Sequence, residues 1–352
     1  MDITKDPPEI VKKDILNKVL SYFKLGANCT FVIETNNCTF YDVVLKDGCS
    51  VKKFQSRISD IQLRLKSEHP IHIEHNFSEG GLKLQVINKP KDSTNFYDSY
   101  KITQTPEGKE APLLPFFLGF DYYDNLVETD LAENPHILLG GSTGSGKTIA
   151  LHCLIANALM NDNVDIYLGD PKSVEFHPYK QLHEVVQVAN SYEEHISMLL
   201  QLNEIMEQRF EILKKHNATK ISQVGYLPKI IVIIDEIADL MLQDDRFHRF
   251  EKTLTKLCQK CRAAGIFIII ATQRPSVNIV SGSIKANFPA RISCKVSSKI
   301  DSKVIMDEQG ADDLIGKGDA IIKNYQHNIP LRFRFPFVDS KEIIARQLLK
   351  YS

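Results

Sequence analysis

The chain has 352 residues, of which 43% are hydrophobic, and its 43 Lys+Arg nearly balance its 44 Asp+Glu. This length and composition allow a sizeable core in two or three domains, and the near-neutral charge excludes a protein that binds nucleic acid through an overall basic coat. The longest apolar runs, near 230–234 and 266–271, are far shorter than the ~18–20 residues that a membrane-spanning helix needs.

The first 90 residues are expected to form a small α+β domain (1–90). Residues 8–24 carry apolar side chains at helical spacing, and residues 53–66 also favour a helix. Strands are expected at 29–36, 40–45, 70–76 and 82–88. The following stretch, 91–112, is rich in polar and turn-forming residues without periodicity, which indicates a linker.

The remaining segment, 113–352, has the pattern of an α/β domain. Four apolar runs end in small or polar residues and alternate with long helical segments: "HILLGG", "DIYLGD", "KIIVIIDE" and "IFIIIATQ". Continuous apolar strands of this kind are typical of a mainly parallel sheet that is buried on both faces.

A phosphate-binding loop follows the first of these strands. "GGSTGSGKT" contains Gly141-x-x-x-x-Gly146-Lys147-Thr148, and the segment after it is predicted to be a helix. In such a loop, backbone N–H groups surround phosphate, the lysine reaches the β- and γ-phosphates, and the Thr148 hydroxyl binds Mg²⁺. The expected cofactors are therefore ATP and Mg²⁺, and the expected fold is a RecA-like P-loop NTPase core preceded by the small α+β domain. The predicted nucleotide-binding residues are Gly141, Ser142, Thr143, Gly144, Ser145, Gly146, Lys147 and Thr148.

Two adjacent carboxylates end the strand "KIIVIIDE". Asp235 is predicted to hold Mg²⁺ together with Thr148, and Glu236 to orient or deprotonate the attacking water. The alternative is that the pair only caps the following helix. A neighbouring strand ends in Thr272–Gln273, and Gln273 is predicted to sense the γ-phosphate. These residues favour ATP hydrolysis over nucleotide binding alone.

Several blocks together resemble the FtsK/SpoIIIE family of DNA translocases, within the wider FtsK–HerA ATPases. The blocks are "GSTGSGKT", "GDPKSVEF" (169–176), "IIVIIDEIADLM" (230–241), residues 261–302 and "IGKGDAI" (315–321). The order of elements in 8–90 also resembles the family's α domain, which precedes its β motor domain. The resemblance implies an ATP-driven motor that moves double-stranded DNA through a homo-oligomeric ring, expected to be a hexamer.

The resemblance also implies roles for basic residues. Residues 271–303 contain six basic side chains and one acidic one. Arg274 and Lys285 match one DNA-contacting loop, and Lys299 and Lys303 match a second, with Lys303 at a position where family members often have Arg. Arg262, in "CRAAG", matches the arginine that reaches the neighbouring subunit's γ-phosphate. A solvated basic surface is the plainer alternative for this stretch.

Two other functions stay open for the sequence. Related ATPases of type VII secretion act on protein cargo, and a nucleotide-gated scaffold would open and close without processive movement. The block 271–292 favours DNA, and Glu236 with Arg262 favours an active motor. Chromosome partition and plasmid or mobile-element DNA transfer are both compatible processes.

The seven scattered cysteines are typical of reduced thiols, and no secretory signal opens the chain, so a cytoplasmic location is expected. Family members often carry transmembrane helices and a DNA-reading winged-helix domain, and neither is expected within these 352 residues. Membrane association would then require a missing segment or a partner.

Overall fold

The computed structural model describes residues 8–35, 38–76, 80–87, 94–101, 113–244 and 248–350. The chain divides into two compact units, Met1–Asp92 and Ser93–Ser352. In the described ranges, no helix combines the length and the apolar character that crossing a membrane requires.

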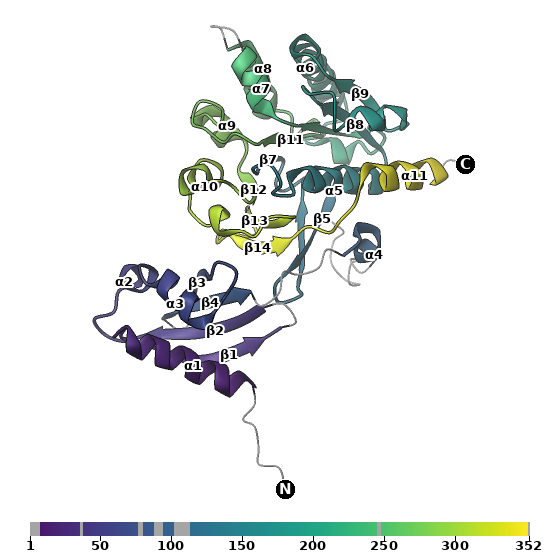
Figure 1. Cartoon of the computed structure of the whole chain (residues 1–352). Coiled ribbons are helices and arrows are strands. Elements are labelled where there is room, and N and C mark those ends of the chain that lie inside the picture. Colours follow the sequence, from purple (N-terminus) through teal and green to yellow (C-terminus); the bar gives the residue numbers. More distant parts are fainter. Residues whose placement is uncertain are drawn as a thin grey trace. The chain divides into compact units, whose positions relative to one another are not determined.

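The first unit is an antiparallel sheet with helices packed against it (Figure 1). In spatial order its strands are β1 (Ala27–Glu34), β2 (Cys38–Leu45), β4 (Gly81–Ile87) and β3 (His72–Asn76). Leu16 and Leu20 of helix α1 (Pro8–Tyr22) are buried in one core cluster with Leu82 and Leu84 of β4. The helices and strands of this unit therefore share a core of their own.

Residues 53–66, expected to be helical, form two short helices, α2 (Val51–Gln55) and α3 (Ile58–Leu65). Ser56 lies between them, and its hydroxyl donates to the carbonyl oxygen of Lys53 at 2.7 Å. Serine side chains compete in this way for backbone groups that a continuous helix would use.

The second unit is built on one large sheet whose strands are listed in spatial order. They are β6 (Leu126–Asp130), β5 (Pro115–Asp121), β14 (Leu331–Arg334), β13 (Asp319–Lys323), β12 (Ala290–Cys294), β7 (His136–Gly140), β11 (Ile266–Thr272), β10 (Lys229–Ile234), β8 (Val164–Gly169) and β9 (Val185–Ala189). Neighbouring strands from β12 to β9 are parallel, and those from β12 to β6 are antiparallel. The expected α/β class with a mainly parallel sheet is confirmed.

Both faces of the parallel strands are buried, which explains their unbroken apolar sequences. In β10, Ile231 and Ile233 belong to the core on one face of the sheet, whereas Val232 and Ile234 belong to the core on the other face. Full burial of one such side chain contributes about 1.5–3 kcal/mol, so each strand of this kind strongly favours the folded state.

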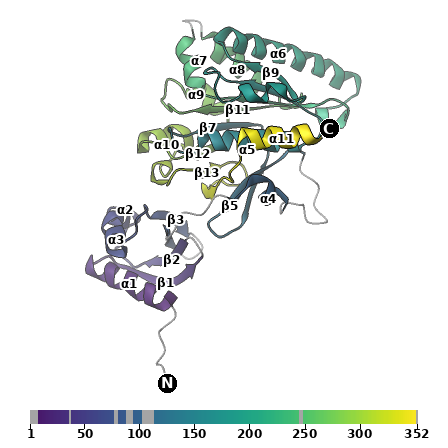
Figure 2. The same cartoon turned by 45° about the vertical axis from the view of Figure 1, so that its right-hand side comes forward.

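Helices cover the two faces of this sheet (Figures 1 and 2). One face is covered by α4 (Phe96–Tyr100), α5 (Lys147–Met160), η2 (His177–Gln181) and α11 (Ser340–Lys350). The other is covered by α6 (Tyr192–Lys215), α7 (Ile237–Gln243), α8 (Arg249–Cys258), α9 (Gly282–Asn287) and α10 (Lys299–Met306).

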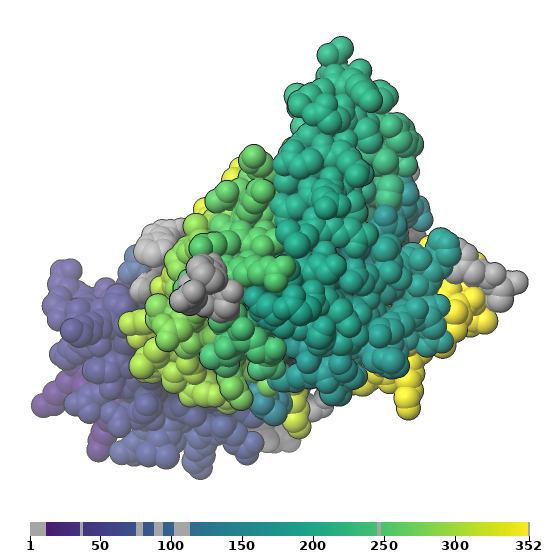
Figure 3. Space-filling model, turned by 90° about the horizontal axis from the view of Figure 1, so that it is seen from above, coloured from purple at the N-terminus to yellow at the C-terminus, as the bar shows by residue number. Residues whose placement is uncertain are grey.

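Helix α6 is the long amphipathic helix of this second face, and in the space-filling view it forms a teal ridge along the surface (Figure 3). Its first turn is closed by a capping box, in which the Ser191 hydroxyl accepts from the Glu194 backbone N–H at 3.3 Å and the Glu194 carboxylate accepts from the Ser191 N–H at 3.4 Å. Such caps satisfy N–H groups that the helix leaves without partners.

Part of the stretch suggested as a linker is folded onto the second unit. Phe96 of α4 is fully buried in the core, and its N–H donates to the carbonyl oxygen of Phe337 at 2.9 Å. Asn95 caps α4 by accepting from the backbone of Tyr97 at 2.9 Å. An aromatic anchor and a helix cap thus hold residues 94–101 in place, while 91–93 and 102–112 lie outside the described residues.

Candidate nucleotide site and basic loops

The predicted phosphate-binding loop joins β7 to α5 and is fixed by neighbouring strands. The N–H of Gly141 donates to the Thr272 carbonyl oxygen at 3.2 Å, and the N–H of Ser142 donates to that of Lys295 at 2.8 Å. These bonds tie the start of the loop to the carboxyl ends of β11 and β12. The edge where parallel strands end is the usual ligand-binding edge of an open α/β sheet.

Close backbone packing explains the glycine at position 146. Gly146 has φ +101°, and a Cβ there would lie 2.2 Å from the amide nitrogen of Gly318. The same amide donates to the carbonyl oxygen of Ser145 at 2.9 Å. The segment "IGKGDAI" (315–321) therefore supports the phosphate-binding loop from the side.

Lys147 and Asp235 form a buried ion pair at the centre of the site. Lys147 begins α5, Asp235 follows β10, and both side chains are about 3–4% exposed. The N–H of Asp235 donates to the Gly169 carbonyl oxygen at 2.8 Å, which fixes the carboxylate at the sheet edge. Beside this pair, the Thr148 hydroxyl donates to a carboxylate oxygen of Glu175 at 3.4 Å.

Glu236 is buried and held by its neighbours, and it makes no capping hydrogen bond to α7. Its carboxylate accepts from the Thr272 hydroxyl at 2.9 Å and from the Gln273 backbone N–H at 3.0 Å, and it lies 3.8 Å from the Lys172 ammonium group. Its backbone has φ +53°, a conformation that costs a non-glycine residue roughly 1–3 kcal/mol and that concentrates at functional sites. The Glu236 side chain therefore does not cap α7, and its hydrogen bonds go to Thr272 and Gln273 instead.

Gln273 connects Glu236 to the phosphate-binding loop. Its side-chain oxygen accepts from the Thr143 hydroxyl at 3.2 Å, while its backbone holds Glu236. The next residue, Arg274, is exposed, and its N–H donates to the Thr272 hydroxyl at 3.0 Å. Residues 272–274 thus join the phosphate-binding loop and Glu236 to the exposed segment that begins with Arg274.

A cavity of about 540 Å³ lies against the phosphate-binding loop. Besides the loop itself, it is lined by Glu175, Gln273, Lys317, Arg334, Phe335 and Phe337. The sequence patterns did not assign Arg334 or the two phenylalanines to the site, because none of the three belongs to a motif. Arg334 is the last residue of β14, and the phenylalanines follow that strand. Only the fold brings this segment to the loop.

Burial raises the pKa of the Glu175 carboxyl, and the negative charge of Asp235 raises it further. The carboxylates of Glu175 and Asp235 are therefore near enough to influence each other, and Glu175 accepts a hydrogen bond from Thr148. Carboxylate and hydroxyl oxygens are the ligands that Mg²⁺ prefers, so these side chains fit the Mg²⁺ expected at Thr148 and Asp235.

Arg262 lies near the amino ends of the parallel strands, whereas the phosphate-binding loop of its own chain lies at their carboxyl ends. It precedes β11, whose other end carries Thr272, and the seven residues of this strand span roughly 20 Å at ~3.3 Å per residue. The side chain is exposed, and its Nε donates to the carbonyl oxygen of Ala132 at 3.0 Å. Arg262 is thus too far from its own loop to act there.

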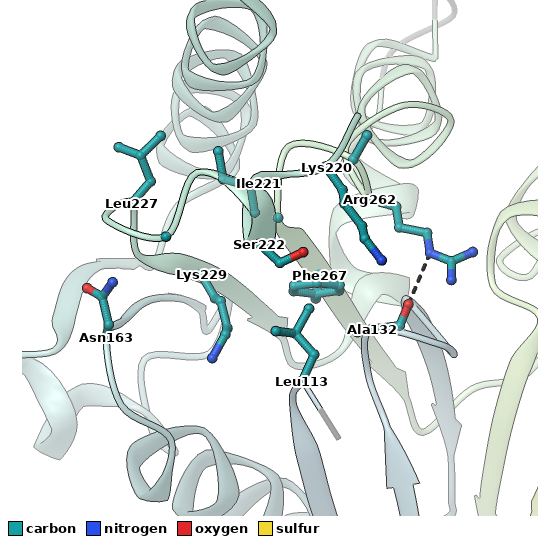
Figure 4. Close-up of a pocket in the computed structure, with 13 residues that line it drawn as sticks. Leu113, Ala132, Asn163, Lys220, Ile221, Ser222, Leu227, Lys229, Arg262 and Phe267 are labelled. Atoms are coloured by element: carbon teal, nitrogen blue, oxygen red, sulfur yellow. Dashed lines mark hydrogen bonds between the residues drawn. The ribbon is translucent and has the colours of Figure 1, made fainter. Parts of the chain in front are cut away.

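Arg262 borders a second cavity, of about 460 Å³ (Figure 4). Lys220 extends its ammonium group into the same cavity, and the Phe267 ring forms part of its floor. The edge of the sheet that presents Arg262 therefore offers a cationic hollow with an apolar floor.

The four predicted DNA-contacting residues have different surroundings. Arg274, Lys299 and Lys303 are exposed. Lys285 is half-buried and pairs with Asp307 at 2.8 Å. Lys285 therefore holds α9 against the end of α10, and it shares the Asp307 carboxylate with Arg291.

Comparison with known proteins identifies relatives of this chain. The model of the FtsK/SpoIIIE family matches residues 101–227 and 222–277. A DNA translocase FtsK of Lactococcus lactis subsp. cremoris is 33% identical over 96% of this chain and 47% of its own length. The DNA translocase SftA of Bacillus subtilis is 32% identical over 94% of this chain and 36% of its own length. The chain thus spans about half or less of these curated relatives.

Solved structures share the fold. The pCW3 conjugation coupling protein TcpA, solved as a monomer with ATPγS, has a TM-score of 0.67 at 22% identity, over 97% of this chain and all of that one. The cytoplasmic domain of the type VII secretion ATPase EccC from Thermomonospora curvata has a TM-score of 0.62 at 19% identity, over 73% of this chain and 34% of that one. At these identities the similarity establishes the P-loop ATPase fold alone.

Proposed function

Since this chain belongs to the FtsK/SpoIIIE family, we propose that it is an ATP-driven motor that moves double-stranded DNA through a ring of identical copies. The observation that carries the proposal is the direct covalent and hydrogen-bonded connection between Glu236, Gln273 and exposed Arg274. A change at the nucleotide is transmitted through this connection to a positive charge on the surface.

The nucleotide end of the motor is the phosphate-binding loop. Its N–H groups and the Lys147 ammonium group bind the triphosphate, and binding draws Lys147 from Asp235 toward the β- and γ-phosphates. Thr148 and Asp235 would hold Mg²⁺, which supplies positive charge that neutralises the phosphate oxygens. This arrangement fits ATP rather than an uncharged ligand.

Glu236 acts on the attacking water. Its carboxylate orients the water and accepts a proton from it. Thr272 and Gln273 hold the carboxylate in position through their hydrogen bonds. Gln273 also contacts Thr143 of the phosphate-binding loop, so loss of the γ-phosphate changes the surroundings of both residues.

Arg262 completes the site of a neighbouring copy. Because it lies at the far edge of the sheet from its own loop, only another subunit's nucleotide is within its reach in an assembly. An arginine presented in this way stabilises the charge of the transferred phosphate and couples hydrolysis in one subunit to the state of the next. A closed ring, a hexamer by family resemblance, repeats this contact at every interface.

Duplex DNA is bound through its phosphates in the centre of this ring. The ring is proposed to act in the cytoplasm. Arg274, Lys299 and Lys303 supply exposed positive charge, while the chain as a whole remains nearly neutral. Phosphate contacts of this kind position DNA without reading its sequence, as a motor that travels over any sequence requires.

The rate of ATP hydrolysis with and without linear duplex DNA tests this proposal. We expect duplex DNA to stimulate the wild-type chain at least several-fold, and Lys147→Ala to abolish hydrolysis. The double variant Arg274→Ala, Lys299→Ala is expected to keep nucleotide affinity but to lose the stimulation. In a plot of log K for DNA binding against log salt concentration, the slope should become less steep by about 0.9 for each lost phosphate contact.

Lys180→Ala is the matched control, since Lys180 is exposed on η2, away from the basic loops. It should be stimulated like the wild type. If duplex DNA has no effect while a protein or peptide substrate activates hydrolysis, the motor acts on protein cargo instead. Equal loss of ATP affinity in the double variant would refute the assignment of these residues to DNA.

A further inference from the structure

A carboxylate that the mechanism above does not use points into the nucleotide cavity. Glu175 lines this cavity together with Lys147 and Thr148, and its carboxylate accepts a hydrogen bond from the Thr148 hydroxyl at 3.4 Å between the oxygens. Glu236, by contrast, is turned toward Thr272. Two glutamates therefore serve different parts of the site.

The backbone of Glu175 is held by a buried anchor. The Asp170 carboxylate is completely buried and accepts from the N–H groups of Glu175 and Phe176, both at 2.9 Å. The neighbouring Phe176 side chain is fully buried in the core. The loop that carries Glu175 is thus fixed on both sides, so the carboxylate is presented to the cavity by a built structure rather than by a free surface loop.

The contact with Thr148 has a chemical consequence. A hydroxyl group that binds a cation through its oxygen must send its proton elsewhere. In this site the proton points to Glu175, which leaves the oxygen lone pairs of Thr148 available. Partners of this kind orient the residues that contact a metal and strengthen metal binding.

We propose that Glu175 is a positioning residue for the divalent cation: it orients the Thr148 hydroxyl and adds negative charge beside it. The inference rests on the proposed nucleotide site and adds a residue to it. Glu175 and Asp235 then flank Thr148 on the side of the cation, whereas Glu236 serves the water. The role follows from the structure of "GDPKSVEF", in which Asp170 holds the loop and Glu175 enters the cavity.

Titration with magnesium chloride tests this role independently of hydrolysis. The affinity of the full chain for a fluorescent, non-hydrolysable ATP analogue is measured at increasing Mg²⁺ concentrations. We expect Glu175→Gln to need about 10- to 100-fold more Mg²⁺ for half-maximal tightening, the range typical of lost outer-shell partners. Affinity in EDTA should be unchanged or slightly higher, because a negative charge near the triphosphate is removed.

Two further variants keep the test decisive. Glu204→Gln, at an exposed position of α6, should titrate like the wild type. Glu175→Asp, which retains the charge on a shorter side chain, should have an Mg²⁺ midpoint between those of the wild type and Glu175→Gln. An unchanged Mg²⁺ midpoint in Glu175→Gln would overturn the inference. A wild-type chain that binds no ATP analogue would instead overturn the nucleotide site itself, so the two failures are distinguishable.

Discussion

Replacing Arg262 by alanine is expected to slow ATP hydrolysis by about 10³- to 10⁵-fold, the range found for arginines that stabilise a transferred phosphate from a neighbouring protein. The fold should tolerate the change, because Arg262 is exposed and its Nε donates one hydrogen bond, to Ala132. ATP affinity should be nearly unchanged in the isolated subunit, since the arginine does not reach its own loop. Steady-state hydrolysis and equilibrium binding of an ATP analogue measure the two effects.

Mixing two inactive variants distinguishes this role from an effect within one subunit. Arg262→Ala keeps an intact phosphate-binding loop, and Lys147→Ala keeps an intact Arg262. Interfaces between the two variants combine both intact halves, so a mixture should hydrolyse ATP faster than either variant alone. Lack of recovery in mixed assemblies, or near-normal hydrolysis by Arg262→Ala, would show that the arginine does not act on a neighbour.

Glu236→Gln is expected to lower the rate of the hydrolytic step by about 10²- to 10⁴-fold, because the amide cannot accept the water's proton. The substitution nearly conserves shape, and its side-chain oxygen can still accept from Thr272 or Gln273. ATP should therefore stay bound without being cleaved. Single-turnover hydrolysis, measured beside ATP affinity, separates these outcomes.

Asp239→Asn is the matched control for Glu236→Gln. Lys172 lies 3.6 Å from Asp239 and 3.8 Å from Glu236, so both substitutions remove one of its carboxylate partners. Of the two carboxylates, Glu236 also accepts hydrogen bonds from Thr272 and Gln273. A control variant within a few-fold of wild type is expected; if Glu236→Gln is equally active, the carboxylate has no catalytic role.

The parallel sheet could be predicted from sequence because burial on both faces leaves an unmistakable pattern. Every residue of β11 is buried, and its sequence contains no charged residue. The phosphate-binding loop was equally predictable, since its glycines meet backbone constraints that other residues cannot. At Gly146 that constraint comes from Gly318, a contact the sequence contained only as an unexplained block, "IGKGDAI".

Features that depend on distant residues could not be predicted. The family resemblance predicts that Lys285 contacts DNA, but it gives no sign that Asp307, 22 residues away, pairs with this lysine. Phe96 lies in a polar stretch that suggested a linker, and its burial in the core and its hydrogen bond with Phe337 explain why this stretch folds. The location of Arg262 at the far edge of the sheet likewise follows from strand direction rather than from its motif.

Displacement of a labelled third strand from a triplex at the end of linear duplex DNA tests movement most directly. A motor that travels along the duplex should strip the third strand in an ATP-dependent reaction. We expect displacement by the wild-type chain. We expect none by the double variant Arg274→Ala, Lys299→Ala, and none by the single variant Glu236→Gln. A wild-type chain that hydrolyses ATP in response to duplex DNA yet leaves the triplex intact would contradict the account, because hydrolysis would then not be coupled to travel.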